Sequence, residues 1–111
     1  MDQKVIAAAQ VLKLLGDKTR LAVVGLLLED DFCVCEFVEI FQMSQPAISQ
    51  HLRKLKDSGL IQEKRKSQWI IYSLNTENEH YPLVKNILKH LPDQAEKVEE
   101  LERKGLRISC N

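Results

Sequence analysis

The first part of the chain places apolar residues at the spacing of α-helices. One such run covers residues 3–15 and stops at Gly16, and Asp17 can cap a second helix over 18–28. The apolar residues of the first run form an unusually wide stripe: Val5, Ala8, Ala9, Leu12 and Leu15, with Val11 and Leu14 on its flank. A stripe this wide is typical of a helix that is covered on two sides, by its own domain and by a second subunit.

Two further helices are predicted before residue 59. The acidic residues 29–31 offer caps for a helix of about ten residues with a stripe of Val34, Phe37, Val38 and Phe41. A short turn follows at 42–44, and Ser44 can cap a helix that begins Gln45-Pro46, where proline is tolerated. Its buried face is predicted to be Ile48, Leu52 and Leu55, and Gly59 ends it.

After Gly59 the period changes from that of a helix to that of a strand. Residues 60–65 and 69–74 are strand-like and flank a polar turn, so we expect a β-hairpin. Helical spacing returns from about residue 79 to Leu91, and 93–104 form a charged helical segment before a loose tail. This order predicts a single, mostly α domain with a small hairpin (α+β), a winged helix-turn-helix with the helix-turn-helix at about 33–58 and the wing at about 60–74.

Composition narrows the protein class. A chain of 111 residues with 44% hydrophobic residues can form one small core, and its apolar runs are too short and too polar to cross a bilayer. The three cysteines, an odd number, argue against a disulfide framework. We therefore expect a cytoplasmic protein without membrane partners.

Basic residues are concentrated in one segment although the whole chain is neutral. Residues 45–70 contain six basic and two acidic residues, a net charge of +4, against −3 for residues 1–44 and −1 for residues 71–111. One basic face on a neutral protein is compatible with binding to nucleic-acid phosphates. A solvated charged surface would have the same composition.

The fourth helix has the residues of a DNA-reading helix. In a winged helix-turn-helix it enters the major groove, while the hairpin follows the backbone or the minor groove. Amide, guanidinium and hydroxyl groups can read base edges there, and the exposed side is predicted to carry Gln45, Ser49, Gln50, Arg53 and Lys54, with Lys64, Arg65, Lys66 and Gln68 on the wing. His51, at the edge of the buried face, is predicted to pack or to contact a phosphate. An amphipathic helix and hairpin of any α+β domain is the alternative, but the ordered combination favours double-stranded DNA.

Cys33 and Cys35 supply the other candidate site. On a regular helix they would point about 200° apart. Their thiolates suit soft, thiophilic ions, and a position at a helix start should lower the thiol pKa. An ion that draws both sulfurs together would then have to distort the helix before the DNA reader. A thiol redox enzyme would need Cys-X-X-Cys in another setting, and no catalytic arrangement is evident, so we do not expect an enzyme.

The segments VLKLLGDKTRLAVVGLL, CVCEF, SQPAISQHLRKLKDSGLI and RKSQWIIYSL resemble the ArsR/SmtB family of metal-sensing repressors, in the same order across about residues 9–74. The resemblance implies a homodimer paired through the first and last helices, with the C-terminal dimerisation helix and tail at about 79–111. It implies a repressor that blocks an operator until an inducer ion releases it. It also places six residues on or near the DNA: Ser44, Gln45, Ser49, Gln50, His51 and Arg53. Ser67 departs from the glycine that the family often has in the wing turn.

The resemblance is strongest to the repressors of arsenical resistance operons, whose Cys-Val-Cys-Asp-Leu-Cys segment has three sulfur ligands for arsenite or antimonite. Here Val38 replaces the last cysteine, and Cys110, within roughly 16 Å of chain from Gly105, is the candidate third ligand, from its own chain or its partner's. A cadmium-, lead- or zinc-responsive repressor and a thiol-oxidation-responsive one are the alternatives. His80, His90 and Asp93 match a second zinc site of some relatives incompletely and are interpreted as surface residues. No cofactor for folding and no small organic substrate are expected.

Overall fold

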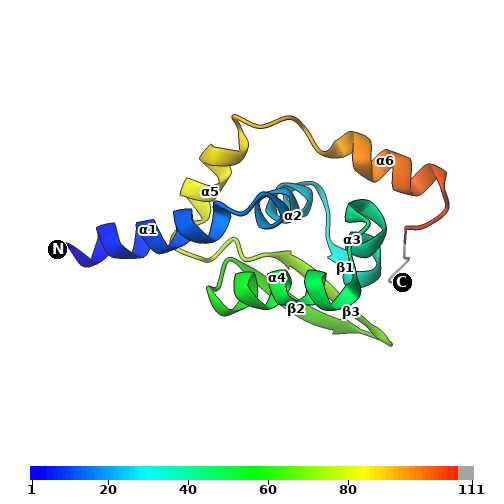
Figure 1. Cartoon of the computed structure of the whole chain (residues 1–111), viewed down its shortest axis with the longest axis horizontal. Coiled ribbons are helices and arrows are strands. Elements are labelled where there is room, and N and C mark those ends of the chain that lie inside the picture. The colour runs from blue at the N-terminus through cyan, green and yellow to red at the C-terminus, as the bar shows by residue number, and fades with distance from the viewer. Residues whose placement is uncertain (108–111) are drawn as a thin grey trace.

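A computed structural model describes residues 1–107 (Figure 1). The elements, in chain order, are α1 (Gln3–Leu15), α2 (Lys18–Glu29), β1 (Phe32–Cys33), α3 (Val34–Phe41), α4 (Gln45–Asp57), β2 (Ile61–Lys66), β3 (Trp69–Leu74), α5 (Tyr81–Leu88) and α6 (Ala95–Arg103). The helix-turn-helix of α3 and α4 followed by the β2–β3 hairpin is the winged helix-turn-helix fold. The predicted fold class is therefore confirmed.

The helix starts follow the capping residues that the sequence contains. The Asp17 carboxylate accepts the N–H groups of Thr19 and Arg20 at 2.9 and 3.0 Å. The Ser44 hydroxyl accepts the Ala47 N–H at 3.3 Å, with Pro46 in the first turn of α4. Each cap satisfies N–H groups that have no partner within the helix, so α2 and α4 begin where the sequence predicts.

The core lies where α2 passes behind the helix-turn-helix. Five consecutive residues of α2, Val23–Leu27, are buried, so this helix is covered nearly all round. Ile48, Leu52 and Leu55 of α4 are fully buried against it, as predicted. Leu28, in the last turn of α2, is 38% exposed.

The sheet contains a short strand that the sequence does not predict. The strand order is β1-β3-β2, all antiparallel, with Phe32 opposite Tyr72 and Cys33 opposite Ile71. Residues expected to begin the third helix therefore form strand β1, and α3 has eight residues instead of about ten. The Phe32 side chain is fully buried, and this burial together with backbone pairing to β3 outweighs the local helical preference.

The wing turn is a two-residue loop between the paired residues Lys66 and Trp69. Ser67 occupies its first position with φ of 57°, the left-handed region that glycine tolerates better. Ser67 has a positive φ and Gln68 does not, which is the pattern of a type II′ turn. The wing thus forms at the predicted place without the family's glycine.

The terminal helices lie on opposite sides of the core. Figure 1 shows α1 projecting from the body of the molecule, with α6 at the far end beside α3. Val5 and Leu12 of α1 are 53% and 52% exposed, whereas Val11 and Leu15 are buried. On α6, by contrast, Leu101 is buried in the core. Within residues 1–107, no helix has the length and apolar character that a bilayer crossing requires.

Candidate DNA-binding surface and thiol site

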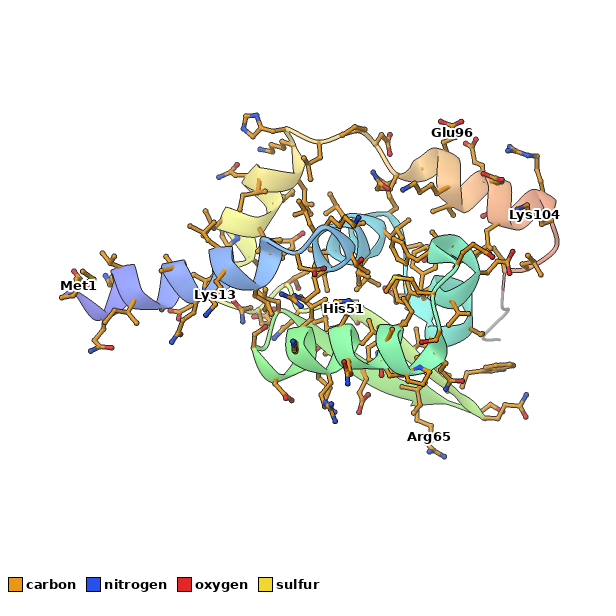
Figure 2. All side chains as sticks on the ribbon, in the orientation of Figure 1. Met1, Lys13, His51, Arg65, Glu96 and Lys104 are labelled. Atoms are coloured by element: carbon orange, nitrogen blue, oxygen red, sulfur yellow. The ribbon has the colours of Figure 1, made fainter. Side chains whose placement is uncertain are left out.

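The basic segment lies on α4 and the hairpin, which lie next to each other on one side of the molecule (Figure 1). In Figure 2 the Arg65 side chain extends from this hairpin away from the body of the protein. The candidate DNA-contacting residues that are exposed are Ser44, Gln45, Gln50, Arg53, Lys54, Lys64, Arg65, Lys66 and Gln68, and Ser49 is half-buried. The structure thus brings the predicted cationic and amide groups of helix and wing to the solvent.

His51 is half-buried and lies between α4 and the start of α2 (Figure 2). Its Nδ1 is 3.2 Å from Arg20 Nη1 and 4.0 Å from the Asp17 carboxylate. A guanidinium has only donors, so Nδ1 accepts this hydrogen bond and the imidazole proton is on Nε2. Through Nδ1, His51 therefore connects α4, the helix predicted to read DNA, to α2.

A second contact fixes the wing relative to α4. Lys56 Nζ lies 2.8 Å from Glu63 Oε1 on β2, and Glu63 is paired with Tyr72 on β3. The ammonium group of Lys56 lowers the pKa of Glu63, while burial and the Glu63 carboxylate raise the pKa of Tyr72 to about 12. The salt bridge between Lys56 and Glu63 thus connects α4 to the wing, the two elements predicted to contact DNA.

The two thiols are already together. Cys33 is the N-cap of α3 with an extended backbone (φ −97°, ψ 169°), while Cys35 is in the first helical turn. The turn between these conformations brings the Sγ atoms within 2.8 Å, both as free thiols. The prediction that a regular helix holds the pair apart, so that an ion must distort it, is therefore wrong, because only one of the two residues is helical.

The predicted lowering of the thiol pKa is also wrong for Cys33. Its side chain is 2% exposed at the β1–α3 junction. Burial, followed by the hydrogen bond with the Cys35 thiol, raises the pKa of Cys33 to about 12. Loss of water from around a thiolate outweighs the favourable field of the helix N-terminus. Cys35, as its position off the apolar stripe suggests, is exposed.

A buried carboxylate lies behind the pair. Glu36 is 2% exposed, and its Oε1 accepts the Cys33 N–H at 2.9 Å. Its Oε2 is 3.1 Å from Nε of Arg107, a residue far away in sequence. The Arg107 guanidinium also contacts the Asp30 carboxylate at 3.2 Å and the Asp31 carbonyl at 3.1 Å, and covers the Phe32 ring at 4.3 Å. We call Arg107 and the residues it contacts, Asp30, Asp31, Phe32 and Glu36, the Arg107 clasp.

The thiols open onto a groove of about 410 Å³. One side of this groove is α3, with Val34 and Val38 beside the thiols; the other is the wing, with Trp69 and Ile70. Gln45 at the start of α4 and Gln68 in the wing turn complete the lining. An ion at the sulfurs would therefore occupy a space bordered by α4 and the wing, the two elements predicted to face DNA.

The remaining candidate ligands fall into two groups. Cys110 lies outside the described residues. His80 and His90 are on either side of α5, with His80 at its N-cap and His90 exposed beyond its end. Within residues 1–107, no three His, Cys, Asp or Glu side chains form a group that could hold a metal ion.

Sequence reasoning missed Glu36, Arg107 and Trp69. Glu36 had a signal, since a carboxylate three residues after an N-cap is the pattern of a capping box. The contact of Arg107 with residues more than seventy positions earlier had no local signal. Trp69 belongs to a predicted strand, but its place in the thiol groove depends on how the wing packs against α3.

Comparison with known proteins agrees with this geometry. Over 105 residues, which are 92% of the chain and 87% of the relative, it is 36% identical to the arsenical resistance operon repressor of Escherichia coli strain K12. It is 35% identical to the cadmium resistance regulatory protein CadC homolog of Staphylococcus aureus over 68% of the chain and 64% of that protein.

Among solved structures, the transcriptional repressor BigR from Xylella fastidiosa matches with a TM-score of 0.70 and 32% identity, over 78% of this chain and 85% of that one. The homodimeric winged helix-turn-helix domain of a possible ArsR-family regulator from Mycobacterium bovis matches with a TM-score of 0.65 and 26% identity, over 83% and 91%. Residues 17–63 match the family model described as bacterial regulatory protein, arsR family. The chain is therefore a member of the ArsR family, a DNA-binding transcriptional repressor and not an enzyme.

Proposed function

We propose that this repressor controls a metal(loid) resistance operon and leaves its operator when arsenite or antimonite binds Cys33, Cys35 and Cys110. The observation that carries the proposal is the thiol pair, two sulfurs 2.8 Å apart at the edge of a groove shared with the DNA-facing elements. The similarity to arsenical resistance operon repressors supports the same inducer class.

The chemistry of the pair favours a thiophilic ion. Two thiols with no carboxylate or imidazole completing a ligand group within residues 1–107 suit ions that prefer sulfur. Ligand sulfurs must be separated by more than 2.8 Å, since tetrahedral zinc, for example, would hold them about 3.8 Å apart. A small rotation of the exposed Cys35 side chain supplies that separation without unwinding α3.

Two sets of contacts connect the thiols to the elements predicted to contact DNA. α3 packs directly on α4 through the helix-turn-helix, so a shift of α3 moves the DNA-reading helix. Cys33 is also paired with Ile71 of β3, one strand of the wing. We propose that the ion changes the relative placement of α4 and the wing, a two-state coupling between inducer and DNA.

We propose that the repressor acts as a homodimer in the cytoplasm, where its DNA is. The exposed apolar residues of α1, Val5, Ile6 and Leu12, support an interface on this helix. Of the two C-terminal helices, α5 is the better second contact, because it lies on the same side of the molecule as α1, whereas α6 lies at the far end (Figure 1). The similarity to the homodimeric Mycobacterium bovis domain supports a homodimer.

The deciding experiment measures release from a fluorescent DNA fragment taken from upstream of the protein's own gene. The double variant Cys33→Ser, Cys35→Ser is expected to bind this DNA normally, because serine is a good N-cap at position 33 and residue 35 is exposed. It should no longer respond to arsenite or antimonite. Release of this variant by arsenite at the wild-type concentration would refute the thiol assignment.

The same assay separates the alternative inducers. The similarity to the cadmium resistance CadC homolog of Staphylococcus aureus supports cadmium as an alternative inducer, with lead and zinc as the other thiophilic candidates. The contact between the two sulfurs makes oxidation to a disulfide a further candidate signal. Arsenite or antimonite acting at the lowest concentration supports the proposal. Stronger release by cadmium, lead or zinc would instead identify a repressor that responds to that metal. Release by a thiol oxidant alone would identify a repressor that responds to thiol oxidation.

A further inference from the structure

The two thiols meet because Cys33 lies outside α3. Its backbone is extended (φ −97°, ψ 169°), whereas Cys35 is in the first helical turn, and this change of conformation brings the Sγ atoms within 2.8 Å. The sequence by itself favours a longer helix that starts at the acidic residues 29–31 and includes Cys33. In that helix the thiols would point about 200° apart. The thiol pair therefore requires that the longer helix be disfavoured.

Strand pairing is a limited restraint on this conformation. β1 is an edge strand of two residues, with Phe32 opposite Tyr72 and Cys33 opposite Ile71 on β3. A strand this short is held by few backbone hydrogen bonds. Further contacts that favour the extended form are therefore significant, and the Arg107 clasp supplies them.

The Arg107 guanidinium engages the groups with which the longer helix would begin. With Asp31 as N-cap, the first bond of that helix would run from the Cys35 N–H to the Asp31 carbonyl. In the structure this carbonyl accepts a hydrogen bond from Arg107 Nη2 at 3.1 Å. The same nitrogen lies 3.2 Å from the carboxylate of Asp30, another possible cap. Arg107 thus competes directly with the start of a longer α3.

Glu36 supports the shorter helix at the same time. Its Oε1 accepts the Cys33 N–H at 2.9 Å, the capping-box bond that makes residue 33 the N-cap. Its Oε2 lies 3.1 Å from Arg107 Nε. A carboxylate that is only 2% exposed is stable as an ion beside such a partner, so the guanidinium keeps Glu36 where it accepts this bond.

The end of α6 brings Arg107 to this position (Figure 1). Gly105 has φ of 71°, the Leu106 N–H bonds the Leu101 carbonyl at 3.0 Å, and the Gly105 N–H bonds the Glu102 carbonyl at 3.0 Å. These are the two bonds of a Schellman motif, which reverses the chain after a helix. Because Leu101 is buried in the core, packing of α6 sets the place of this reversal.

We infer that Arg107 is a positioning residue of the inducer site: it holds residue 33 extended and so selects the conformation in which the thiols of Cys33 and Cys35 can bind one ion. The identity of that ion rests on the proposed function, whereas the selection of the backbone conformation does not. The competing state is a longer α3 that includes Cys33. Without Arg107, part of the molecules should adopt this state, and the apparent affinity for the ion falls in proportion to the fraction that stays extended.

Two measurements on Arg107→Ala test the inference. NMR chemical shifts of the Cys33 Cα and Cβ carbons, recorded without arsenite, report the proportion of extended and helical backbone. Ultraviolet absorption of arsenic–thiolate bonds gives the affinity for arsenite. We expect binding to weaken about tenfold and about one tenth of the molecules to remain extended at Cys33, because the apparent dissociation constant rises as the inverse of the competent fraction. A Cys33 backbone as extended in the variant as in the wild type would overturn the inference.

Val34→Pro supplies a matched rescue. Val34 is the first residue of α3, where proline is favoured, and the residue before a proline is disfavoured in the helical region. The substitution therefore holds Cys33 extended without help from Arg107. In this background the loss of arsenite affinity caused by Arg107→Ala should fall from about tenfold to less than about twofold. An equal loss in both backgrounds would mean that Arg107 acts through stability or charge, and would overturn the inference.

Control variants keep the outcomes distinct. Lys104→Ala removes an exposed pair with Glu100 near the end of α6 and should change neither measurement (Figure 2). If Arg107→Ala fails to fold, Arg107→Lys takes its place: it keeps a positive charge but makes a single point contact, and its smaller loss should again be relieved by Val34→Pro.

The two hypotheses fail in different ways. Arsenite binding that survives replacement of Cys33 and Cys35 by serine refutes the proposed function, and the chemical shifts of Cys33 then still decide the role of Arg107. Arsenite binding that depends on both cysteines, combined with an extended Cys33 in Arg107→Ala, refutes only the inference about Arg107.

Discussion

The unequal environments of the two thiols give a sharp prediction about their reactivity. Cys33 is 2% exposed with a pKa raised to about 12, whereas Cys35 is exposed at the surface. At pH 8, a thiol with a pKa of 12 is ionised to about one part in 10⁴, while the same cysteine in the unfolded chain, with a pKa of 9.0, is about one tenth ionised. Because the thiolate is the nucleophile, Cys33 should react about a thousandfold more slowly in the folded protein than in the unfolded chain.

The assay uses a Cys110→Ser variant treated with iodoacetamide at pH 8, with adducts located by mass spectrometry of peptides. We expect one adduct, on Cys35, and modification of Cys33 only in denaturant. Arsenite added first should protect Cys35. Modification of Cys33 at the same rate as Cys35 would refute the reasoning, since it would mean that the helix N-terminus, and not burial, sets the reactivity of this thiol.

The pH dependence of stability follows from the same shift. The pKa of Cys33 is raised in the folded state from 9.0 to about 12, so folding favours the protonated thiol. The stabilisation is complete below about pH 9 and is lost as the pH rises through 12. Denaturant unfolding between pH 8 and pH 11 should therefore show a falling free energy of unfolding, with a smaller fall for Cys33→Ser. An equal fall in both proteins would contradict the assigned cause.

Four further substitutions test other parts of the structure. Leu12→Glu, at a 52% exposed position of α1, should dissociate the proposed dimer with little loss of monomer stability; a dimer that persists in sedimentation would exclude α1 from the interface. Arg53→Ala on the exposed face of α4 should weaken operator binding by ~1–3 kcal/mol in anisotropy titrations without changing Tm, and unchanged affinity would remove it from the DNA contacts. Ser67→Gly should stabilise the wing by about 0.5 kcal/mol, because relief of the positive φ exceeds the added chain entropy; a lower Tm would contradict this. Tyr72→Phe should reduce the loss of stability between pH 10 and pH 12, where the raised pKa of the phenol makes the native state sensitive to alkali, and an unaltered alkaline profile would count against it.

Local chemistry explains why much of the fold could be predicted. The caps Asp17 and Ser44, the stop at Gly59 and the spacing of Ile48, Leu52 and Leu55 act within a few residues, and the structure agrees with each. The change of period after Gly59 likewise locates the wing, including its turn at Ser67, despite the missing glycine. The cationic and amide residues of α4 are exposed for a similar reason, because a helix with one apolar side turns its other side to water. On β2, every residue after Ile61 is polar and exposed.

The thiol site, by contrast, depends on contacts between distant parts of the chain. The residues Cys33 and Cys35 and their affinity for soft ions are evident from the sequence alone. That Cys33 belongs to a strand was decided by pairing with Ile71, and the closeness of the two sulfurs and the high pKa of Cys33 follow from that placement and the burial it brings. The approach of Arg107 to Glu36 required the packing of Leu101 and the reversal at Gly105. Sequence thus determined which chemical groups this repressor has. Tertiary packing decided the distances between these groups and their exposure to water, because both depend on neighbours that no local pattern contains.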